Sequence, residues 1–291
     1  RREGQHLPLP RPPQLLVTGF TRELDEAARL ARAAGAILMK IYATDFAVSY
    51  KGPNDPVTEA DKRANELLVQ GLRASFPADG VVAEESVDNS DALLKGRVWY
   101  VDPLDGTHEF ISKNGEFSVM IGLAVNGEAR VGVVYRPVGD VLFAGIADQE
   151  AWVEAQSKRT LLLVSSRTDL AQLRLVVSRS HRHQILGAIR ERLGLGKETR
   201  CGSVGLKVGL IAAQEADLYV EPSEFTKAWD SCGPEAILRG AGGRMTDLAG
   251  HSLIYGGQDL QNRTGLVATN GVCHDRVIAA IAPLVHKANL R

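Results

Sequence analysis

The sequence of 291 residues has only three cysteines, Cys201, Cys232 and Cys273, and none of them belongs to a CxxC pair. An odd number of widely spaced cysteines argues against a disulfide framework or a zinc site, and is typical of reduced thiols in the cytoplasm. Long apolar runs are also lacking, since none approaches the roughly 18 residues of a membrane span. The stretch QLLVTGF is too short for the core of a signal peptide. We therefore predict a cytoplasmic protein with no membrane partner.

The sequence has no excess of charge of either sign. It contains 34 basic and 35 acidic residues, and the formal net charge is -1. This balance argues against a nucleic-acid polymer or an anionic membrane surface as the main partner. The length suits one large domain or two of ordinary size, with a core that needs no disulfide or metal to fold.

Two common catalytic or binding motifs are missing. The glycines of GAGGRMTDLAG do not follow the GxGxxG spacing, and no Walker lysine motif occurs, which argues against a nucleotide-binding module of those types. The stretch CGSVG has Cys201 where a nucleophile elbow needs glycine, which argues against a serine hydrolase.

Residues 1–20 open with RREGQHLPLPRPP, which has no initiator Met and is rich in Pro and Arg. We expect these residues to be either a disordered arm or extra residues added for expression of the protein, and in both cases to lie outside the fold. A helix of about 20 residues is predicted next, because apolar residues recur at three and four positions. They are Leu24, Ala27, Ala31, Ala34, Leu38 and Ile41. In a second predicted helix, Thr58 is the N-cap, Asp61 completes a capping-box-like pair, and Pro77 marks the end.

The remaining patterns predict an α+β fold in two halves. In residues 21–150, the β-rich runs GVVAEES, RVWYVDP, FSVMIGLAV, ARVGVVYRP and DVLFAGIA predict a mainly antiparallel sheet. Residues 151–291 alternate between strands and helices, which predicts a second α/β half. Its predicted elements are a strand LRLVVSRS, a helix from about 184, a helix over 203–214, a strand ADLYVEP, a helix over 231–240 and a strand LVATN.

Five acids fall at the ends of predicted elements, namely Asp61, Glu84, Asp102, Asp105 and Asp230. Carboxylates that follow strands can converge where the strands end, and they repel unless a cation lies among them. In DPLDGT, Pro103 favours a turn, so that both aspartates and the Leu104 carbonyl can face the same side. Such an all-oxygen set favours Mg²⁺. The free N–H groups at Gly106 and Thr107 would attract a phosphate.

A purely structural interpretation exists for each acid. Asp61 and Asp230 could only cap helices, Asp102 and Asp105 could form turns, and Glu84 could be a surface acid beside Glu85. That interpretation requires five coincidences, and a plain turn explains DPLDGT poorly after so apolar a strand.

Four motifs together resemble the Mg²⁺-dependent, lithium-sensitive phosphatases related to inositol monophosphatase. They are DPVTEAD (55–61), AEES (83–86), WYVDPLDGTHEF (99–110) and AWDSCGPEAIL (228–238), and the match runs from about residue 24 to 285. The resemblance implies a layered αβαβα sandwich of the sugar-phosphatase type. It also implies a small phosphate ester as substrate. Homodimers are common in this family, although no stretch of this sequence identifies an interface.

The resemblance also implies roles for the acids, with two to three Mg²⁺ ions bound. Glu84, Asp102, the Leu104 carbonyl and Thr107 would surround a first ion, and Asp102, Asp105 and Asp230 a second. A third, weaker ion would bind near Glu84. Asp61 and Thr107 would activate a metal-bound water for in-line attack, without a phosphoenzyme.

Three stretches favour the 3′(2′),5′-bisphosphate nucleotidase branch, which hydrolyses the 3′-phosphate of 3′-phosphoadenosine 5′-phosphate. They are DPLDGTHEFISKNGEFSV, VVSRSH (176–181) and GSVGLKVGLIAAQEADLY (202–219). A second phosphate needs extra cationic or hydroxyl partners, and the predicted ones are Ser180, His181, Ser203 and Lys207.

The branch assignment leaves alternatives open. Val204 stands where the branch often has serine, Lys207 could be a solvated helix residue, and Glu221 stands where inositol monophosphatases bind sugar hydroxyls. Inositol monophosphatase is therefore the alternative function. Fructose 1,6-bisphosphatase and a non-catalytic binding protein of the same fold are weaker alternatives. His108 and Glu109 receive no predicted role.

Overall fold

The computed structural model describes residues 19–52, 55–86, 91–196, 198–257 and 259–288, so nearly all of the predicted N-terminal arm lies outside the described residues. The α-helices are α1 (Thr21–Tyr42), α2 (Glu59–Ser75), α3 (Thr107–Ile111), α4 (Ile185–Leu193), α5 (Val204–Ala212), α6 (Ala228–Gly240) and α7 (His274–Lys287). The strands of the first half are β1 (Val48–Gly52), β2 (Asp55–Thr58), β3 (Gly80–Ala83), β4 (Arg97–Asp105), β5 (Ser118–Val125), β6 (Glu128–Arg136), β7 (Val141–Ile146), β8 (Glu150–Ala155) and β9 (Lys158–Leu161). The later strands are β10 (Leu175–Ser178), β11 (Thr199–Cys201), β12 (Leu218–Glu221), β13 (Arg244–Thr246) and β14 (Leu266–Thr269).

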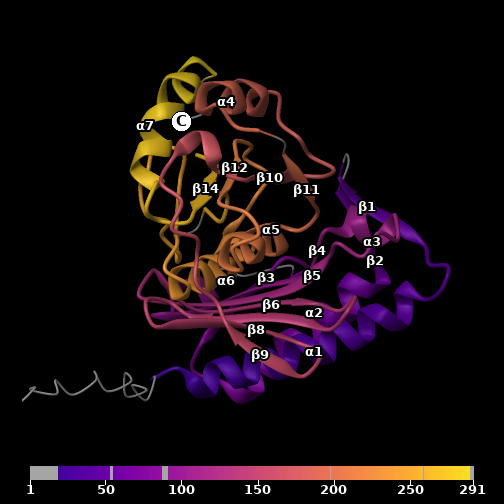
Figure 1. Cartoon of the computed structure of the whole chain (residues 1–291). Coiled ribbons are helices and arrows are strands. Elements are labelled where there is room, and N and C mark those ends of the chain that lie inside the picture. Colours follow the sequence, from indigo (N-terminus) through magenta and orange to yellow (C-terminus); the bar gives the residue numbers. More distant parts are fainter. Residues whose placement is uncertain (1–18, 53–54, 87–90, 197, 258, 289–291) are drawn as a thin grey trace, which may run out of the picture.

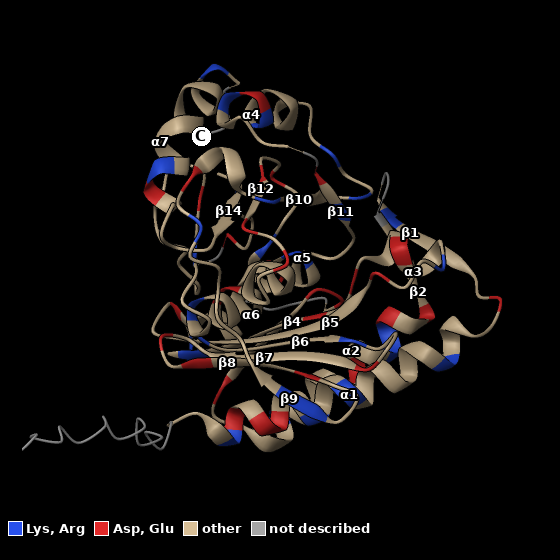
Figure 2. Ribbon diagram, viewed as in Figure 1, with Lys and Arg blue, Asp and Glu red and all other residues tan. Residues whose placement is uncertain are grey.

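These elements stack in five layers. Helices α1 and α2 cover one face of a seven-stranded sheet, and α5 and α6 lie between that sheet and a five-stranded sheet (Figure 1). Helices α4 and α7 form the last layer. The predicted αβαβα sandwich is therefore confirmed. Acidic and basic residues are interspersed over the outer helices, as the balanced composition predicts (Figure 2).

Both N-terminal helices form where the sequence predicts them. Helix α1 buries one face against the first sheet, and α2 begins directly after Thr58. The Thr58 hydroxyl accepts a hydrogen bond from the backbone N–H of Ala60 at 3.1 Å, and the Asp61 carboxylate accepts one from the Thr58 N–H at 2.8 Å. This capping box satisfies two N–H groups that the first turn of a helix leaves unpaired.

The first sheet has the strand order β3-β4-β5-β6-β7-β8-β9. Only β3 and β4 run parallel and the other neighbours are antiparallel, as predicted. The sheet continues through β8 and β9 to Leu161, so the predicted division between residues 150 and 151 falls within β8. Every residue of β9 is exposed, which is why no apolar alternation marks it in the sequence.

The second sheet has the order β11-β10-β12-β14-β13. Strand β10 runs parallel to β11 and β12, whereas β14 runs antiparallel to β12 and β13. Strands β11 and β13, three residues each, and the hairpin of β1 and β2 were not predicted. Segments this short give too few positions for a periodic pattern.

Helix α6 is buried over most of its length between the two sheets. A Cβ at Gly132 of β6 would lie 1.9 Å from the carbonyl oxygen of Gly233, so glycine at 132 allows this close approach of helix and strand. The helix begins at Ala228, whereas the sequence predicts a start at 231. The earlier start arises because the Asp230 carboxylate accepts a hydrogen bond from the Lys227 N–H at 2.6 Å.

The predicted helix over 203–214 is shorter in the structure, since α5 ends at Ala212. The three cysteines are free and buried. Among the described residues, no helix combines the length and apolar character that a membrane crossing requires.

Burial of Glu235 on α6 predicts a pH-dependent stability. Its side chain is 4% exposed, accepts a hydrogen bond from the Tyr255 hydroxyl at 2.6 Å, and lies 3.5 Å from the Arg239 guanidinium. Burial raises the pKa of Glu235 to about 7 from 4.5. The folded state therefore keeps a proton that the unfolded state loses, and stability falls as pH rises from 4.5 to about 7.

Glu235→Gln cannot ionise and keeps an acceptor for Tyr255. We expect it to be more stable than the parent by about 2–3 kcal/mol at pH 8, and by much less at pH 5. Urea unfolding at both pH values measures the difference. The control Glu128→Gln replaces an acid whose side chain is 63% exposed, and should show no such pH-dependent gain. An equal effect of Glu235→Gln at both pH values would contradict the expected ionisation.

Candidate active site

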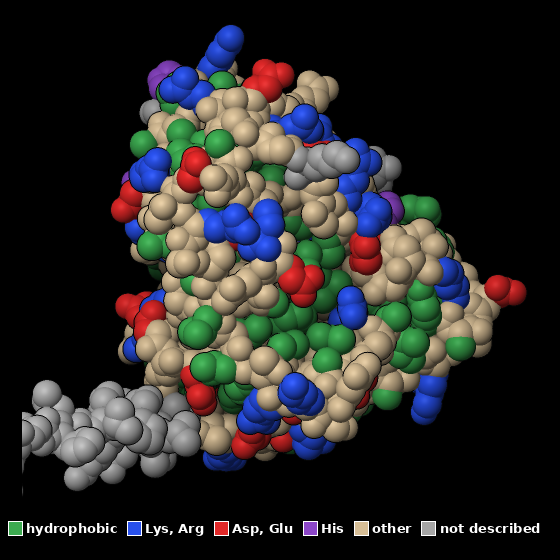
Figure 3. All heavy atoms as spheres, viewed as in Figure 1, with side chains coloured by type: hydrophobic (Ala, Val, Ile, Leu, Met, Phe, Trp, Pro, Cys, Tyr) green, Lys and Arg blue, Asp and Glu red, His purple; other side chains and the backbone are tan. Residues whose placement is uncertain are grey.

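A cavity of about 220 Å³ lies where β4, α3, α5, β12 and α6 meet. On the face shown in Figure 3, hydrophobic side chains gather around the boundary between the two halves, with acidic and basic side chains among them. Every predicted site residue except Asp61 and Ser180 lines the cavity. Those that do are Glu84, Asp102, Leu104, Asp105, Gly106, Thr107, His181, Ser203, Lys207, Glu221 and Asp230.

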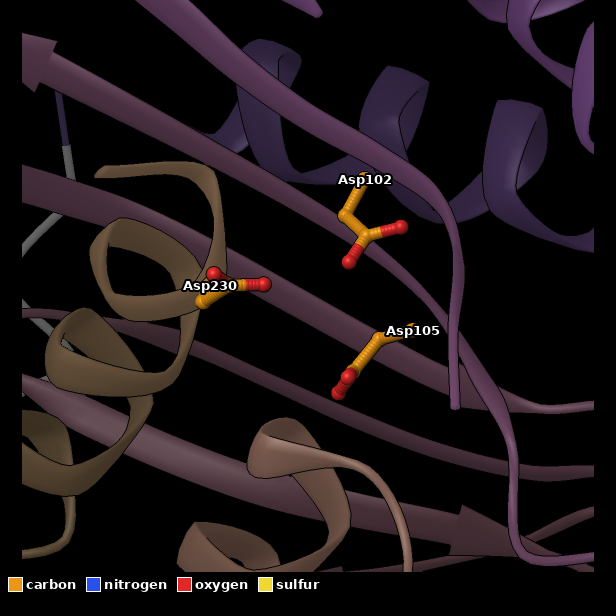
Figure 4. A group of neighbouring side chains, drawn as sticks. All are labelled: Asp102, Asp105 and Asp230. Atoms are coloured by element: carbon orange, nitrogen blue, oxygen red, sulfur yellow. The ribbon is translucent and has the colours of Figure 1, made fainter. Parts of the chain in front are cut away.

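Three carboxylates converge in this cavity. One oxygen each of Asp102, Asp105 and Asp230 lies within 4.8 Å of the others (Figure 4). Asp102 of β4 pairs with Met120 of β5, and Asp105 pairs with Ser118. Between these two pairs the chain advances by three residues in β4 but by only two in β5. The extra residue is a bulge, which lets two acids three positions apart face the same side of the sheet. Asp230 approaches from the first turn of α6.

These carboxyl groups are poorly placed to ionise on their own. The pKa of Asp102 lies well above its usual range because of burial first, and then because of the charges of Glu84, Asp105 and Asp230. The pKa of Asp230 lies well above its usual range for the same kind of reason, burial and then Asp105 and Glu84. A cation would remove this repulsion, and an all-oxygen donor set fits Mg²⁺.

Glu84 follows β3 and lies beside a lysine. The Lys51 ammonium is 3.0 Å from one Glu84 oxygen and 2.6 Å from a Glu85 oxygen. Glu84 is outside the tight group of three aspartates, although its charge acts on two of them. Glu84 does lie beside Glu85, as the alternative of a surface acid has it, and its role as a metal ligand stays a prediction.

Asp61 both caps α2 and contacts Thr107. Its carboxylate accepts hydrogen bonds from the Thr58 N–H and hydroxyl, and burial raises its pKa. The Thr107 hydroxyl lies 3.4 Å from the other Asp61 oxygen and 3.2 Å from the Leu104 carbonyl oxygen. A hydroxyl has only one hydrogen, so these two acceptors compete for it. The capping role and the predicted catalytic role are therefore compatible.

Lys207 is buried in the cavity wall, with 3% of its surface exposed. The alternative of a solvated helix residue is therefore wrong. Its ammonium lies 5.2 Å from the centre of the Tyr219 ring, and its positive charge opposes the rise that burial causes in the pKa of Asp105. It is a cation in a pocket, available to an anionic ligand.

His181 lies against His108, with 5.1 Å between the ring centres, and both line the cavity. Burial lowers the pKa of His181, and His108 lowers it further. Ser180 is directed elsewhere, because its hydroxyl donates a hydrogen bond to Glu109. It acts on the cavity only through that carboxylate.

Two further predicted substrate contacts are occupied within the protein. The Ser203 hydroxyl donates a hydrogen bond to Asp105 at 2.5 Å. Glu221 accepts hydrogen bonds from the Tyr219 hydroxyl at 3.2 Å and from the Ser223 hydroxyl at 2.7 Å. Gly106 precedes α3, which has only five residues and therefore a weak dipole for attracting phosphate.

The structure adds cavity residues that sequence reasoning missed. They are Pro56, Ser178, Val204, Tyr219, Ser223, Phe225, Thr226, Lys227 and Trp229, together with His108 and Glu109, which had no predicted role. The Phe225 side chain is 80% exposed. Its position just before the AWDS motif was the only signal in the sequence.

Comparisons with known proteins agree with this arrangement. The model of the inositol monophosphatase family matches residues 21–286. The 3′(2′),5′-bisphosphate nucleotidase CysQ of Buchnera aphidicola is 37% identical over 241 residues, which cover 81% of this chain and 88% of that protein. Nus factor SuhB of Pasteurella multocida is 32% identical over 245 residues, covering 80% and 88%. The structure of CysQ from Bacteroides thetaiotaomicron matches with a TM-score of 0.73 at 28% identity, covering 86% of this chain and 98% of that one.

The repulsion among the three aspartates predicts that neutralising one of them stabilises the metal-free protein. We expect Asp102→Asn to raise the Tm by about 2–6 °C in the presence of a chelator, since it removes a buried charge and keeps an oxygen for the Leu104 N–H. Differential scanning calorimetry measures the change. In Mg²⁺ the parent should gain more in Tm than the variant does.

Asp79→Asn is the matched control. Asp79 accepts hydrogen bonds from Arg97 and from Trp99, both at 2.9 Å, so it already has a cationic partner. The control should therefore lower the Tm. If Asp102→Asn lowered the Tm of the metal-free protein as well, repulsion would not be the dominant effect in the cavity.

Proposed function

Because the chain belongs to the inositol monophosphatase family, whose members are phosphoric monoester hydrolases, we propose that it hydrolyses the 3′-phosphate of 3′-phosphoadenosine 5′-phosphate. The observation that carries this choice is the buried Lys207 in the cavity that holds the acids. A bisphosphate presents a second anionic group, and a desolvated ammonium is a strong partner for it. The similarity to CysQ nucleotidases supports the same substrate.

The cavity offers an all-oxygen set of donors, and we propose that it holds two to three Mg²⁺ ions. The side chains of Glu84, Asp102, Asp105 and Asp230 and the carbonyl of Leu104 would hold them. Mg²⁺, when bound, neutralises charge on the phosphoryl and leaving oxygens and makes a water more acidic. Mg²⁺ suits this set because the donors are all hard oxygens.

Thr107 and Asp61 would handle the proton of the attacking water. The Thr107 hydroxyl can accept a hydrogen bond from that water while it donates its own hydrogen to Asp61 or to the Leu104 carbonyl. Asp61 is buried and held by Thr58, so its other oxygen stays within reach of the Thr107 hydroxyl. This arrangement requires no nucleophilic side chain, and we propose direct hydrolysis without a phosphoenzyme.

The remaining parts of the substrate have partners in the same cavity. His181 and Lys207 would contact the 5′-phosphate, and Phe225 would stack on the adenine. Glu221 is the residue that supports the alternative of inositol monophosphatase, because it lines the cavity and its Oε2 accepts a hydrogen bond from Tyr219 alone, which leaves a lone pair for a sugar hydroxyl. The cytoplasmic location and the homodimer stay predictions.

A comparison of substrates tests the proposal. Phosphate release is measured with Mg²⁺ for 3′-phosphoadenosine 5′-phosphate, inositol 1-phosphate and fructose 1,6-bisphosphate. We expect at least tenfold higher kcat/KM for the nucleotide, and loss of activity with a chelator or with Asp105→Asn. A tenfold preference for inositol 1-phosphate would support the alternative instead. Full activity of Asp105→Asn would reject the metal assignment.

Phe225→Ala separates recognition of the base from the chemistry. Loss of stacking should raise KM for the nucleotide about tenfold with little change in kcat, because one base stack contributes ~1–3 kcal/mol. The KM for inositol 1-phosphate should not change. Ile254→Ala, which removes a side chain 84% exposed and outside the cavity, is the control. An equal rise in KM for both substrates would mean that Phe225 does not contact the base.

A further inference from the structure

Asp105 belongs to β4 of the first half, yet the second half holds its carboxylate. One oxygen, Oδ2, accepts a hydrogen bond from the Ser203 hydroxyl at 2.5 Å and another from the Gly205 N–H at 3.2 Å. Ser203 is the N-cap of α5, and Gly205 lies in the first turn of that helix. The orientation of an acid in the candidate metal site therefore depends on residues about 100 positions away along the chain.

The Ser203 hydroxyl is itself held by a second buried serine. Its Oγ lies 2.8 Å from the Oγ of Ser118, which is the cross-strand partner of Asp105 on β5. A carboxylate only accepts, so the Ser203 hydrogen goes to Asp105 and the Ser118 hydrogen goes to Ser203. Ser118 is 0% and Ser203 4% exposed, so water does not replace these bonds. The three side chains form a relay from Ser118 through Ser203 to Asp105.

The backbone at Ser203 supports a specific role for its hydroxyl. Its φ of 50° and ψ of 131° form a conformation that residues other than glycine rarely adopt. Glu116 holds the residue before Ser203 in place. Its carboxylate accepts hydrogen bonds from the Gly202 N–H at 2.7 Å and from Arg179 at 2.6 Å. The surrounding contacts impose an unfavourable conformation that brings the hydroxyl onto Asp105.

Close packing of α5 completes the arrangement. A Cβ at Gly205 would lie 2.6 Å from the sulfur of Met120 on β5. Glycine at this position therefore lets the helix approach the sheet closely enough for the Gly205 N–H to reach Asp105.

We propose that Ser203 and Ser118 are positioning residues for the cation, which hold Asp105 in the orientation that binds Mg²⁺. The sequence predicts Ser203 as a substrate contact, whereas its hydroxyl points to a metal-binding acid. The proposal rests on the cation site of the proposed function and not on the identity of the substrate. Binding of Mg²⁺ then depends on contact between the two halves.

The test measures Mg²⁺ affinity without substrate, by isothermal titration calorimetry on the full chain, beside the Tm in chelator. Ser203→Ala and Ser203→Gly both remove the hydroxyl, but only glycine tolerates the backbone conformation. We expect both to weaken Mg²⁺ binding about tenfold, because a hydrogen bond to a charged group is lost. The glycine variant should be at least as stable as the alanine variant. Ser118→Ala should weaken binding less, by about threefold.

Ser165→Ala is the matched control. The Ser165 hydroxyl donates a hydrogen bond to Asp217, a buried acid paired with Arg174 and outside the cavity. This variant should lose stability and keep the Mg²⁺ affinity of the parent. A Mg²⁺ affinity of Ser203→Gly within twofold of the parent's would overturn the relay. The relay would also be overturned if Ser165→Ala weakened Mg²⁺ binding as much as Ser203→Ala does. A parent that binds no Mg²⁺ would instead reject the cation site itself.

Discussion

Mutual repulsion among the carboxylates of Asp102, Asp105 and Asp230 is the constraint on which the cavity depends. Each has an oxygen within 4.8 Å of the other two, and because Asp102 is buried and Asp105 and Asp230 are partly buried, water screens their charges only incompletely. The fold nevertheless forces them together, through the bulge of β4 and the close contact of α6 with the first sheet. A site that is unfavourable without a cation is one that would bind a cation well, and its oxygen donors suit hard cations such as the proposed Mg²⁺.

The two halves of the molecule meet at this cavity and hold one another there. Asp105 accepts a hydrogen bond from Ser203, and Glu109 accepts one from Ser180. Glu116 forms an ion pair with Arg179. In each pair, a carboxylate of the first half binds a donor of the second. Asp105 would thus both bind a cation and join the two halves.

Local chemistry explains what could be predicted from the sequence. The capping pair of Thr58 and Asp61 depends on residues three apart, and the turn in DPLDGT depends on Pro103, so both are readable from a short segment. Strands β3 to β7 of the first sheet were predicted because apolar runs mark them, whereas β8 was not predicted. Strand β9 was missed because all its residues are exposed.

Contacts between distant segments could not be predicted in the same way. The bond from Ser203 to Asp105 joins residues 98 positions apart, and no local pattern distinguishes it from a contact with substrate. The burial of Lys207 depends on how α5 packs between two sheets, which a helical pattern alone does not specify. Phe225 is in a segment without a recognisable motif, so its place at the cavity emerged only from the structure.

The proposed chemistry requires that the three aspartates bind one group of cations. Crystals grown with Mn²⁺, a stand-in for Mg²⁺ at oxygen sites, test it most directly through anomalous diffraction. We expect a strong anomalous peak with oxygens of Asp102, Asp105 and Asp230 about 2.0–2.3 Å away. A peak elsewhere with none at these carboxylates, or no peak at saturating Mn²⁺, would contradict it.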